Sequence, residues 1–335
     1  MANNEESLKH EGKSLQFARG LLKYENAILA IIAGGIVGVF SIVTKGANTT
    51  VSNIYNILIQ SSIRGVAAIG QGLIILLGAI DLSVAGVATC ATMIGGSMMT
   101  SDLARNIFGF PLSIYIAIPL VLLIGAGFGL ANGTLVSMTG VPALIVTLGT
   151  WQISKGIAYQ STGGGLITDL PSAIGFIGTG KIGLVPIPIV IFFSIVGIGY
   201  FILHHTQFGR NIYAVGGNPI VAHLSGISVR KTVLIVFLMA GALYGVASIL
   251  GMGRYMSSTM MQMQGLELDT IGAVLIGGIS LSGGRGTIIG MLLGVLIIGI
   301  VNNGLSIIGA STATMFIAKG AIVITAVAID TMRKS

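Results

Sequence analysis

Long apolar stretches follow one another from residue 27 to residue 329, and nearly all charged side chains lie in the gaps between them. Only 8% of the residues are charged, whereas a typical soluble domain has about 25%. A helix needs about 20 apolar residues to cross the hydrocarbon core of a bilayer. No soluble core in a chain of 335 residues could bury so many stretches of that length. The sequence therefore predicts a membrane protein with many spanning segments.

These stretches predict an all-α fold, a polytopic transmembrane helix bundle of about ten spans. The predicted spans are 27–43, 54–78, 82–100, 112–138, 142–161, 185–203, 233–252, 266–281, 286–309 and 313–329. Only a short polar break separates the second span from the third. The division leaves an N-terminal tail, 1–26, a single transmembrane domain, 27–329, and a C-terminal tail, 330–335. The polar start does not resemble a secretory signal, so we expect the first stretch to be retained as a span.

The positions of Lys and Arg predict the orientation of the bundle. An even number of spans puts both termini on one side, and cytoplasmic loops carry an excess of basic residues. If the termini are cytoplasmic, ten basic residues lie inside: Lys9, Lys13, Arg19, Lys23, Arg210, Arg230, Lys231, Arg285, Arg333 and Lys334. Four lie outside: Lys45, Arg105, Lys181 and Arg254. We therefore expect both termini in the cytoplasm.

Several patterns that could indicate chemistry are incomplete. Residues 175–181 match the first seven positions of a P-loop, but Ile182 stands where a Mg²⁺-binding hydroxyl is required. His204 and His205 have no carboxylate or Cys at a metal-ligand spacing, and the lone Cys90 excludes a disulfide. The net charge of +7 is not gathered into a run that could follow a nucleic-acid backbone. We expect no cofactor, no metal, no nucleic-acid partner and no enzymatic activity of the chain's own.

Glycines four residues apart recur inside the apolar stretches. They form the series Gly34/Gly38, Gly125/Gly129, Gly241/Gly245 and Gly286/Gly290/Gly294. Such spacing lets helix backbones approach closely, which favours packing within one bundle. A subunit interface is the alternative.

Polar side chains inside the apolar stretches are candidates for a translocation pathway, because they are costly in lipid. Asp81 and Ser83 lie in the break between the second and third spans, where a carboxylate can cap the following helix. A direct role of Asp81 in transport is the alternative. Asn132, Asn302 and Asn303 lie within spans, where an amide either bonds to a neighbouring helix or lines a hydrophilic path.

A second group of ionisable residues lies within or near the spans. Arg64, Lys155 and Lys319 are basic, and Glu267 and Asp269 form an acidic pair near the start of a span. The two lysines are expected to extend their amino groups toward the membrane surface.

The longest predicted inner loop, 204–232, is longer and less polar than a simple connecting loop. Its segment 206–227 mixes Ile212, Tyr213, Val221 and Leu224 with Gly and Pro, which predicts a short amphipathic helix along the cytoplasmic face. Such a surface suits a cytoplasmic partner.

Four blocks of residues together resemble a known family. They are Gly78–Val84, then Ala131–Val136 with Ile145–Gly149, then segment 206–227, and finally Leu268–Asp269 with Ile276–Arg285 and Asn302–Leu305. In their order and spacing the chain resembles the membrane permease subunit of bacterial ABC importers for monosaccharides of the ribose, xylose and galactose type.

The resemblance implies the ABC importer permease fold, a bacterial inner-membrane location and three kinds of protein partner. These partners are a cytoplasmic ABC ATPase subunit, an extracytoplasmic sugar-binding protein and a second permease copy or paralogue, all in contact with membrane lipid. It also implies that segment 206–227 couples the chain to the ATPase. The matching positions are Gly209, Arg210, Gly216, Gly217, Asn218, Leu224, Ser225 and Gly226.

The sequence departs from the family where Ile220–His223 replaces a Glu-Ala-Ala-Arg-like run, and Ala79 and Ala85 replace glycines. We expect this chain to lack the corresponding salt bridge to the ATPase. The function that follows is the permease subunit of an ATP-driven importer for a monosaccharide or a similar polyhydroxylated small molecule. Alternatives are a permease of the same superfamily for a nucleoside, an amino acid or a furanose-like signal, and an ion-coupled secondary transporter, which would need paired intramembrane carboxylates.

Overall fold

The computed structural model describes residues 26–332, which are mostly helical. The main helices are an N-terminal helix, Asn26–Val43, then α2, Val51–Leu76, α3, Val84–Met99, α4, Ile114–Thr139, α5, Ala143–Thr162, α7, Ile187–His205, α10, Val229–Tyr255, α11, Leu266–Ile276, α12, Ile288–Ile307, and α13, Thr312–Met332. The shorter elements are η1, Ala47–Thr49, α6, Ser172–Thr179, β1, Lys181–Ile182, β2, Val185–Pro186, α8, Gln207–Gly217, and α9, Pro219–Leu224.

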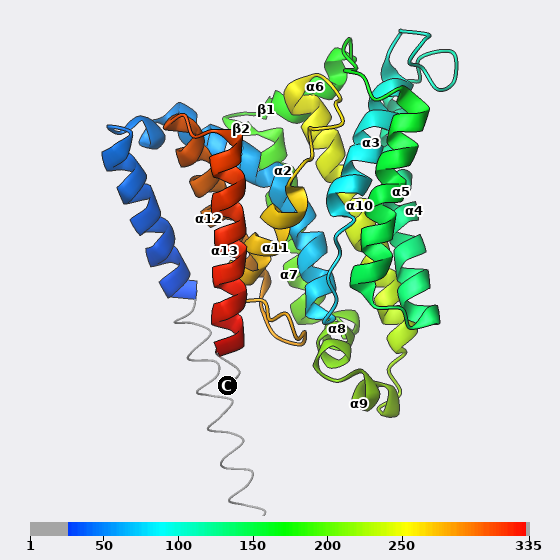
Figure 1. The fold of residues 1–335 in the computed structure, drawn as a ribbon, viewed down its shortest axis with the longest axis vertical. Coiled ribbons are helices and arrows are strands. Elements are labelled where there is room, and N and C mark those ends of the chain that lie inside the picture. Colours follow the sequence, from blue (N-terminus) through cyan, green and yellow to red (C-terminus); the bar gives the residue numbers. More distant parts are fainter. Residues whose placement is uncertain (1–25, 333–335) are drawn as a thin grey trace, which may run out of the picture.

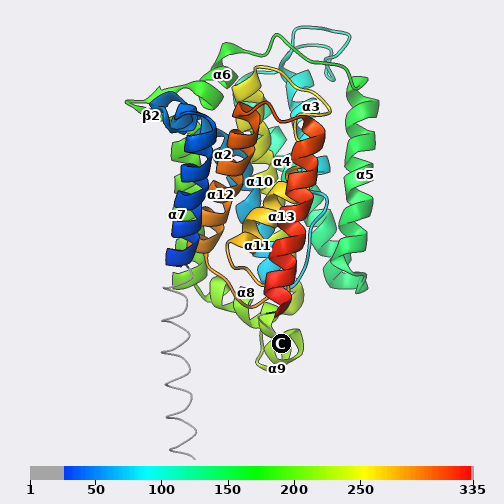
Figure 2. The same ribbon diagram turned by 60° about the vertical axis from the view of Figure 1, so that its left-hand side comes forward.

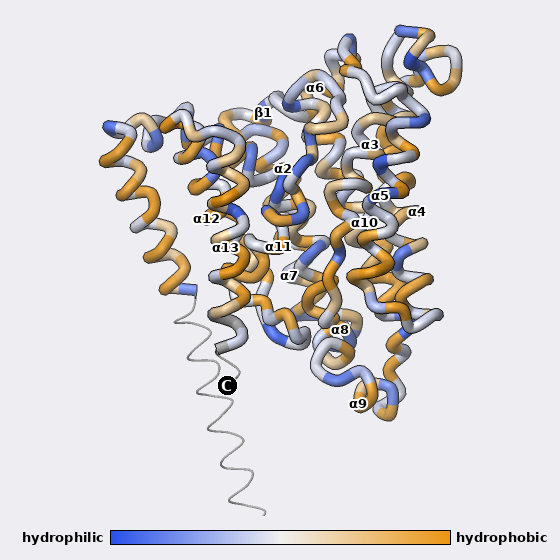
Figure 3. The backbone as a smooth tube through the Cα atoms, viewed as in Figure 1, coloured by the Kyte–Doolittle hydropathy of each residue, from blue (hydrophilic) through white to orange (hydrophobic). Residues whose placement is uncertain are grey.

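The main helices form one bundle with two distinct ends (Figure 1). Helices α8 and α9 lie at one end, together with the start of the N-terminal helix and the end of α13 (Figures 1 and 2). Helix α6 and the antiparallel pair β1–β2 lie at the opposite end. Helices α2 and α10 occupy the interior, and α10 packs against α2, α3, α4 and α6. Apolar residues dominate the outer helices, as expected for surfaces that contact lipid (Figure 3).

Local sequence signals explain where several helices begin and end. Thr50, Ser113 and Ser228 precede α2, α4 and α10, and each side-chain oxygen accepts a hydrogen bond from a backbone N–H near the helix start. Helix α4 ends at Gly140, whose φ of 73° is readily adopted only without a side chain. The chain therefore reverses direction between α4 and α5 within a few residues.

Helices α4 and α10 pack backbone against backbone along their glycines. A Cβ atom on Gly125 would collide with the carbonyl oxygen of Gly241, and one on Gly129 would collide with that of Phe237. On α12, Gly290 and Gly294 approach the backbone of α11 in the same way. The predicted close packing at these spacings is found within the bundle. Gly34 and Gly38 have no neighbouring atom within 4 Å of such a Cβ.

Helices α3 and α11 begin part-way along the bundle rather than at its ends (Figures 1 and 2). Residues 77–83 run inward from the α8–α9 end before α3 starts, and residues 256–265 run inward from the opposite end before α11 starts. Backbone that is not helical at membrane depth must be buried in protein or line a hydrated cavity. These two entering segments therefore mark the places where polar groups gather.

Each of the ten predicted stretches contains a main helix, but the boundaries and lengths differ from the expectation. The second stretch ends at Leu76, and the eighth is helical only as far as Ile276, because turns occupy 277–287. Within residues 26–332, six helices are long and apolar enough to cross a membrane: Asn26–Val43, α2, α4, α7, α10 and α12. Helix α3 and the part Thr312–Ala328 of α13 are shorter apolar segments, and α11 has 11 residues. The tails 1–25 and 333–335 lie outside the described residues.

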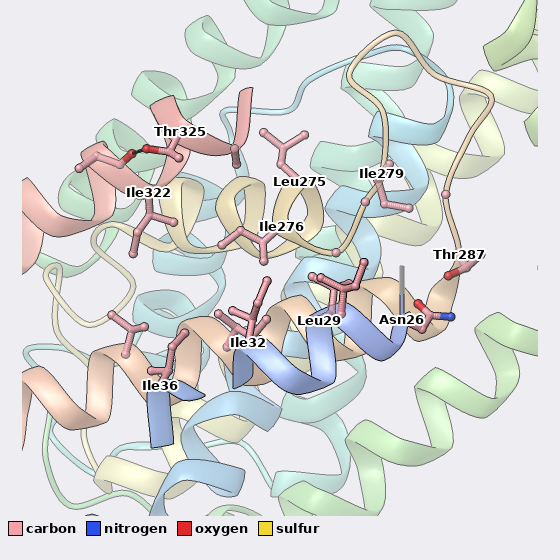
Figure 4. A pocket seen from close by; sticks show the side chains of 18 residues that line it. Asn26, Leu29, Ile32, Ile36, Leu275, Ile276, Ile279, Thr287, Ile322 and Thr325 are labelled. Atoms are coloured by element: carbon pink, nitrogen blue, oxygen red, sulfur yellow. Dashed lines mark hydrogen bonds between the residues drawn. The ribbon is translucent and has the colours of Figure 1, made fainter. Parts of the chain in front are cut away.

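The N-terminal helix stands apart from the bundle along most of its length. A cavity of about 440 Å³ separates it from α11, α12 and α13. The lining is mainly aliphatic, with Leu29, Ile32 and Ile36 facing Ile276 and Ile322 (Figure 4). The helix is held at its other end, where the Phe40 ring lies against Gly304 of α12.

Candidate functional site

Asp81 lies at the inner end of the entering segment 77–83 and is buried. Its Oδ1 accepts hydrogen bonds from the backbone N–H of Ser83 at 2.7 Å and from the Ser83 hydroxyl at 2.5 Å. Its Oδ2 accepts a hydrogen bond from the hydroxyl of Tyr244 on α10 at 3.1 Å. Ser83 is itself the residue that precedes α3. The carboxylate therefore fixes the turn before α3 and ties it to α10, instead of capping the first turn of α3 directly as expected.

A chain of hydrogen bonds extends from Ser83 to two further helices. The Asn132 amide on α4 donates to the Ser83 hydroxyl at 3.0 Å, and the Thr150 hydroxyl on α5 donates to Asn132 Oδ1 at 2.6 Å. The backbone N–H of Leu82 donates to the Thr147 hydroxyl at 3.0 Å. Asn132, one of the predicted candidates, thus bonds between helices. We call Asp81, Ser83, Asn132, Thr150 and Tyr244 the Asp81 cluster.

We expect Asp81→Asn to keep most of the folded stability and part of the function, because the amide oxygen can still accept from Ser83. Asp81→Leu leaves the Ser83 donors buried without this acceptor and leaves the Tyr244 hydroxyl with only Gln71 Oε1, at 3.3 Å. Each unsatisfied group costs about 1–3 kcal/mol. Thermal unfolding of the purified proteins should rank them parent, Asp81→Asn, Asp81→Leu. A complete loss of transport in a well-folded Asp81→Asn protein would instead assign the negative charge itself to the transport cycle.

A second buried carboxylate, Asp269 on α11, pairs with two basic residues from other helices. Arg64 Nε on α2 lies 3.1 Å from Asp269 Oδ2, and Lys319 Nζ on α13 lies 2.9 Å from Oδ1. The Asp269 side chain is 2% exposed, that of Lys319 12% and that of Arg64 31%. Lys319 therefore points inward to an ion pair and does not extend to the membrane surface as predicted. We call Arg64, Asp269 and Lys319 the Asp269 cluster.

The two candidate asparagines on α12 both bond to other helices. Asn302 donates to Asp269 Oδ1 at 3.5 Å, which places it at the edge of the Asp269 cluster. Asn303 and Asn53 of α2 exchange two amide hydrogen bonds, of 2.9 and 3.0 Å. Both residues are buried, so they hold α12 against its neighbours.

Asp269→Asn should destabilise the protein by about 3 kcal/mol, because it leaves the cations of Arg64 and Lys319 without their counter-charge in a low-dielectric interior. The double variant Asp269→Asn/Lys319→Gln removes one cation together with the carboxylate and should recover part of that loss. A double-mutant cycle measured by chemical unfolding gives the coupling. Additive effects would show that Lys319 does not depend on Asp269.

The predicted coupling segment forms two short helices at one end of the bundle, where a single amphipathic helix was expected. Thr206 accepts a hydrogen bond from the backbone N–H of Gly209 at the start of α8, and Asn218 Oδ1 accepts from the N–H groups of Ile220 and Val221 at the start of α9. A Cβ on Gly209 would collide with the backbone at Leu203. These contacts fix α8 directly beneath α7.

Gly216 is the point where α8 meets the interior of the bundle. A Cβ on Gly216 would collide with the carbonyl oxygen of Leu76, the last residue of α2, and would lie 2.6 Å from the backbone nitrogen of Gly284. That nitrogen donates to the same Leu76 oxygen at 2.8 Å. Tyr213 donates to the carbonyl oxygen of Gly286 at 2.9 Å, and burial raises the pKa of Tyr213 to about 12, so this donor stays protonated. Helix α8 is thereby joined to the start of entering segment 77–83.

Helix α9 presents an exposed apolar surface. Ile220, Val221 and Leu224 are 72%, 56% and 79% exposed, whereas Ala222 is buried. Of the remaining coupling candidates, Arg210, Gly217, Ser225 and Gly226 are exposed, and Gly226 has a φ of 82°. The surface formed by Ile220, Val221 and Leu224 is called the α9 face below.

The sequence did not single out Tyr244 or Thr150, which complete the Asp81 cluster. Both lie in stretches that satisfy the apolar pattern, so only the three-dimensional structure shows their partners. Arg64, Asp269 and Lys319 are recognisable in the sequence as ionisable groups near spans. Because such groups are costly in lipid, their presence indicates that they pair with one another. Within the described residues no three His, Cys, Asp or Glu side chains come together to hold a metal ion.

These features define a polytopic helical membrane protein with buried polar clusters at two breaks and an exposed apolar surface, the α9 face, at one end. The family described as the branched-chain amino acid transport system permease component matches residues 53–327. The chain belongs to this family of transport-system permeases.

Three curated relatives each match at least 84% of this chain. The ribose import permease protein of Escherichia coli is 33% identical over 322 residues, covering 95% of this chain and 97% of the relative. The galactose/methyl galactoside import permease protein of Escherichia coli is 35% identical, with 84% and 87% covered. The xylose transport system permease protein of Haemophilus influenzae is 32% identical, with 92% and 96% covered. No solved structure matches the chain.

Proposed function

We propose that the chain is the membrane subunit of an ATP-driven importer for a monosaccharide or a similar polyhydroxylated small molecule, and that it forms the translocation pathway. The observation that carries this proposal is the similarity, over at least 84% of this chain, to permeases for three different sugars. The chain makes and breaks no bond in this proposal. A cytoplasmic ABC ATPase subunit hydrolyses ATP, and an extracytoplasmic binding protein delivers the sugar to a pair of permease chains.

The arrangement of α8 and α9 supports the ATPase as the partner at that end. The α9 face offers an apolar surface outside the bundle, and Gly216 joins α8 to Leu76 inside it. A displacement of α9 by the ATPase would therefore move the entering segment 77–83 and the Asp81 cluster beyond it. ATP binding can shift the balance between two access states only if the contacts with the ATPase differ between those states.

The proposed topology has ten crossings with both termini in the cytoplasm. In its support, the start of the N-terminal helix and the end of α13 lie toward the α8–α9 end of the bundle (Figure 1). The basic residues of the described loops divide evenly between the two ends: Arg210, Arg230, Lys231 and Arg285 are assigned to that end, and Lys45, Arg105, Lys181 and Arg254 to the other. The predicted cytoplasmic excess of basic residues therefore comes from the two tails. In a Cys90-free background, an impermeant thiol reagent added outside should react at Ser172→Cys and not at Ser225→Cys, both of which are exposed positions. The opposite result would invert the topology.

Uptake by the assembled importer tests the function. The chain, its ATPase and its binding protein are reconstituted in proteoliposomes, with ATP on the side of the membrane where the ATPase lies. Uptake of labelled ribose, xylose and galactose is compared with uptake of a nucleoside and of leucine. We expect uptake of one or more sugars that stops without ATP and persists with a protonophore. Uptake of leucine or the nucleoside alone would assign another substrate class, and uptake that needs an ion gradient but no ATP would assign a secondary transporter.

A further inference from the structure

A small polar pocket lies where the entering segment 256–265 meets α2 and the start of α11. Its polar lining comes from Gln60, Arg64, Tyr255, Gln262, Gln264 and Asp269. We call it the α11 pocket. Three amides, a guanidinium, a carboxylate and a tyrosine in one small pocket stand out in a chain with only 8% charged residues. The segment that supplies two of the amides enters the bundle from the end opposite α8 and α9 (Figure 1).

Polar atoms around this pocket are buried without a partner among the described residues. They are Arg64 Nη1 and both amide atoms of Gln262. A buried polar group with no hydrogen bond costs about 1–3 kcal/mol. The Asp269 oxygens, by contrast, are already bound by Arg64 Nε and Lys319. The unpartnered atoms can therefore bond to hydrogen-bonding groups that a ligand brings.

The composition of the lining favours a neutral, hydroxyl-rich ligand. Arg64 Nη1 and Gln262 Nε2 are donors and Gln262 Oε1 is an acceptor, so each can bond to a hydroxyl, which both donates and accepts. Among the lining residues, Arg64 disfavours a cation and Asp269 disfavours an anion. Tyr255, 55% exposed, adds an apolar ring at the rim. Stacking of a sugar ring on such a side chain leaves the hydroxyl edge free to enter.

The size of the pocket sets what can enter. It encloses about 40 Å³, and one water-sized group needs about 10–15 Å³. The pocket therefore admits a few hydroxyl groups along one edge of a sugar and leaves the ring outside, against Tyr255.

We propose that the α11 pocket binds the hydroxyl edge of the transported monosaccharide as it enters the pathway from the extracytoplasmic end. This inference rests on the proposed function and adds a specific place within the permease where the sugar is bound, separate from the Asp81 cluster. Gln262 is its central residue, because its amide offers one donor and one acceptor side by side, which matches two neighbouring hydroxyls.

The test is protection of an introduced thiol. Gln264→Cys places a thiol at an exposed position on the rim, and Gln160→Cys, on the exposed surface of α5, is the matched control, both in a Cys90→Ala background. The assembled permease and ATPase, without the binding protein, are treated with N-ethylmaleimide with and without ribose, xylose or galactose at millimolar concentration. We expect a sugar that the parent importer transports to slow modification at position 264 at least threefold and to leave position 160 unchanged. Adding Gln262→Leu should remove the protection.

The outcomes separate this inference from the proposed function. If the importer transports a sugar and that sugar protects neither position, the α11 pocket holds only water and the inference fails while the function stands. Equal protection at both positions would indicate a general conformational change and would also overturn it. If no sugar is transported and none protects, both proposals fall together. Retained protection in the Gln262→Leu protein would remove Gln262 from the site.

Discussion

Gly216→Ala should reduce sugar uptake to below a tenth of the parent value, whereas Gly217→Ala, one residue further along α8, should leave it nearly unchanged. A single methyl group at Gly216 collides with the Leu76 carbonyl oxygen and crowds the Gly284 nitrogen, and backbone atoms cannot rotate away as a side chain can. The same methyl at Gly217 meets no atom within 4 Å. Overpacking of this kind costs about 1–3 kcal/mol.

The measurement pairs uptake with thermal unfolding of the purified chain. Gly216→Ala should lower the melting temperature as well as transport, because relieving the collision requires α8 to move away from the end of α2. The hydrogen bond from Gly284 to Leu76 would be disturbed at the same time. Parental uptake by the Gly216→Ala protein would show that the contact between α8 and α2 does not transmit motion.

Leu224→Asp should prevent association with the ATPase while the chain still folds. Leu224 is 79% exposed on the α9 face, so no core contact is lost when it is replaced. A buried apolar anchor at the centre of an interface contributes at least about 2 kcal/mol, which corresponds to roughly a 30-fold weaker complex. Co-purification of the ATPase with tagged permease measures the effect directly.

Leu103→Asp is the matched control, because Leu103 is 67% exposed in a loop at the opposite end of the bundle. It should co-purify with the ATPase as the parent does. If the Leu224→Asp and Leu103→Asp proteins retain the ATPase equally, the α9 face is not its docking surface.

The apolar stretches predicted where helices form because each spans enough residues to bury or expose one continuous apolar surface. The pattern could not predict where α11 stops, since Ile279 continues the apolar stretch while the backbone already turns at Gly277 and Gly278. It also could not show that Asp81 faces Tyr244, because a helix that is apolar on all sides carries no signal for the direction of one hydroxyl. These partners depend on the packing of α2, α3 and α10.

For the predicted coupling segment, too, some features follow from the sequence and others only from the structure. Its Gly and Pro residues indicated an unusual loop, and Asn218 with Pro219 explains the start of α9. A Cβ atom would collide with Leu76 at Gly216 and would meet no atom within 4 Å at Gly217, and a sequence that reads Gly-Gly does not show this difference. Only the position of α8 against the end of α2 distinguishes them.

The cavity beside the N-terminal helix has a consequence for the response of this protein to its membrane. The helix is attached near Phe40 and through Asn48, which donates to the Val37 carbonyl oxygen, and the part from Asn26 to Ile36 borders the cavity. A helix fixed at one end can change its tilt without breaking contacts in the bundle, and tilt is how a span adapts to bilayer thickness. Thick bilayers would therefore bring the helix upright and thin ones would incline it, so that the cavity widens and narrows with the lipid composition while α2 and α10 keep their places.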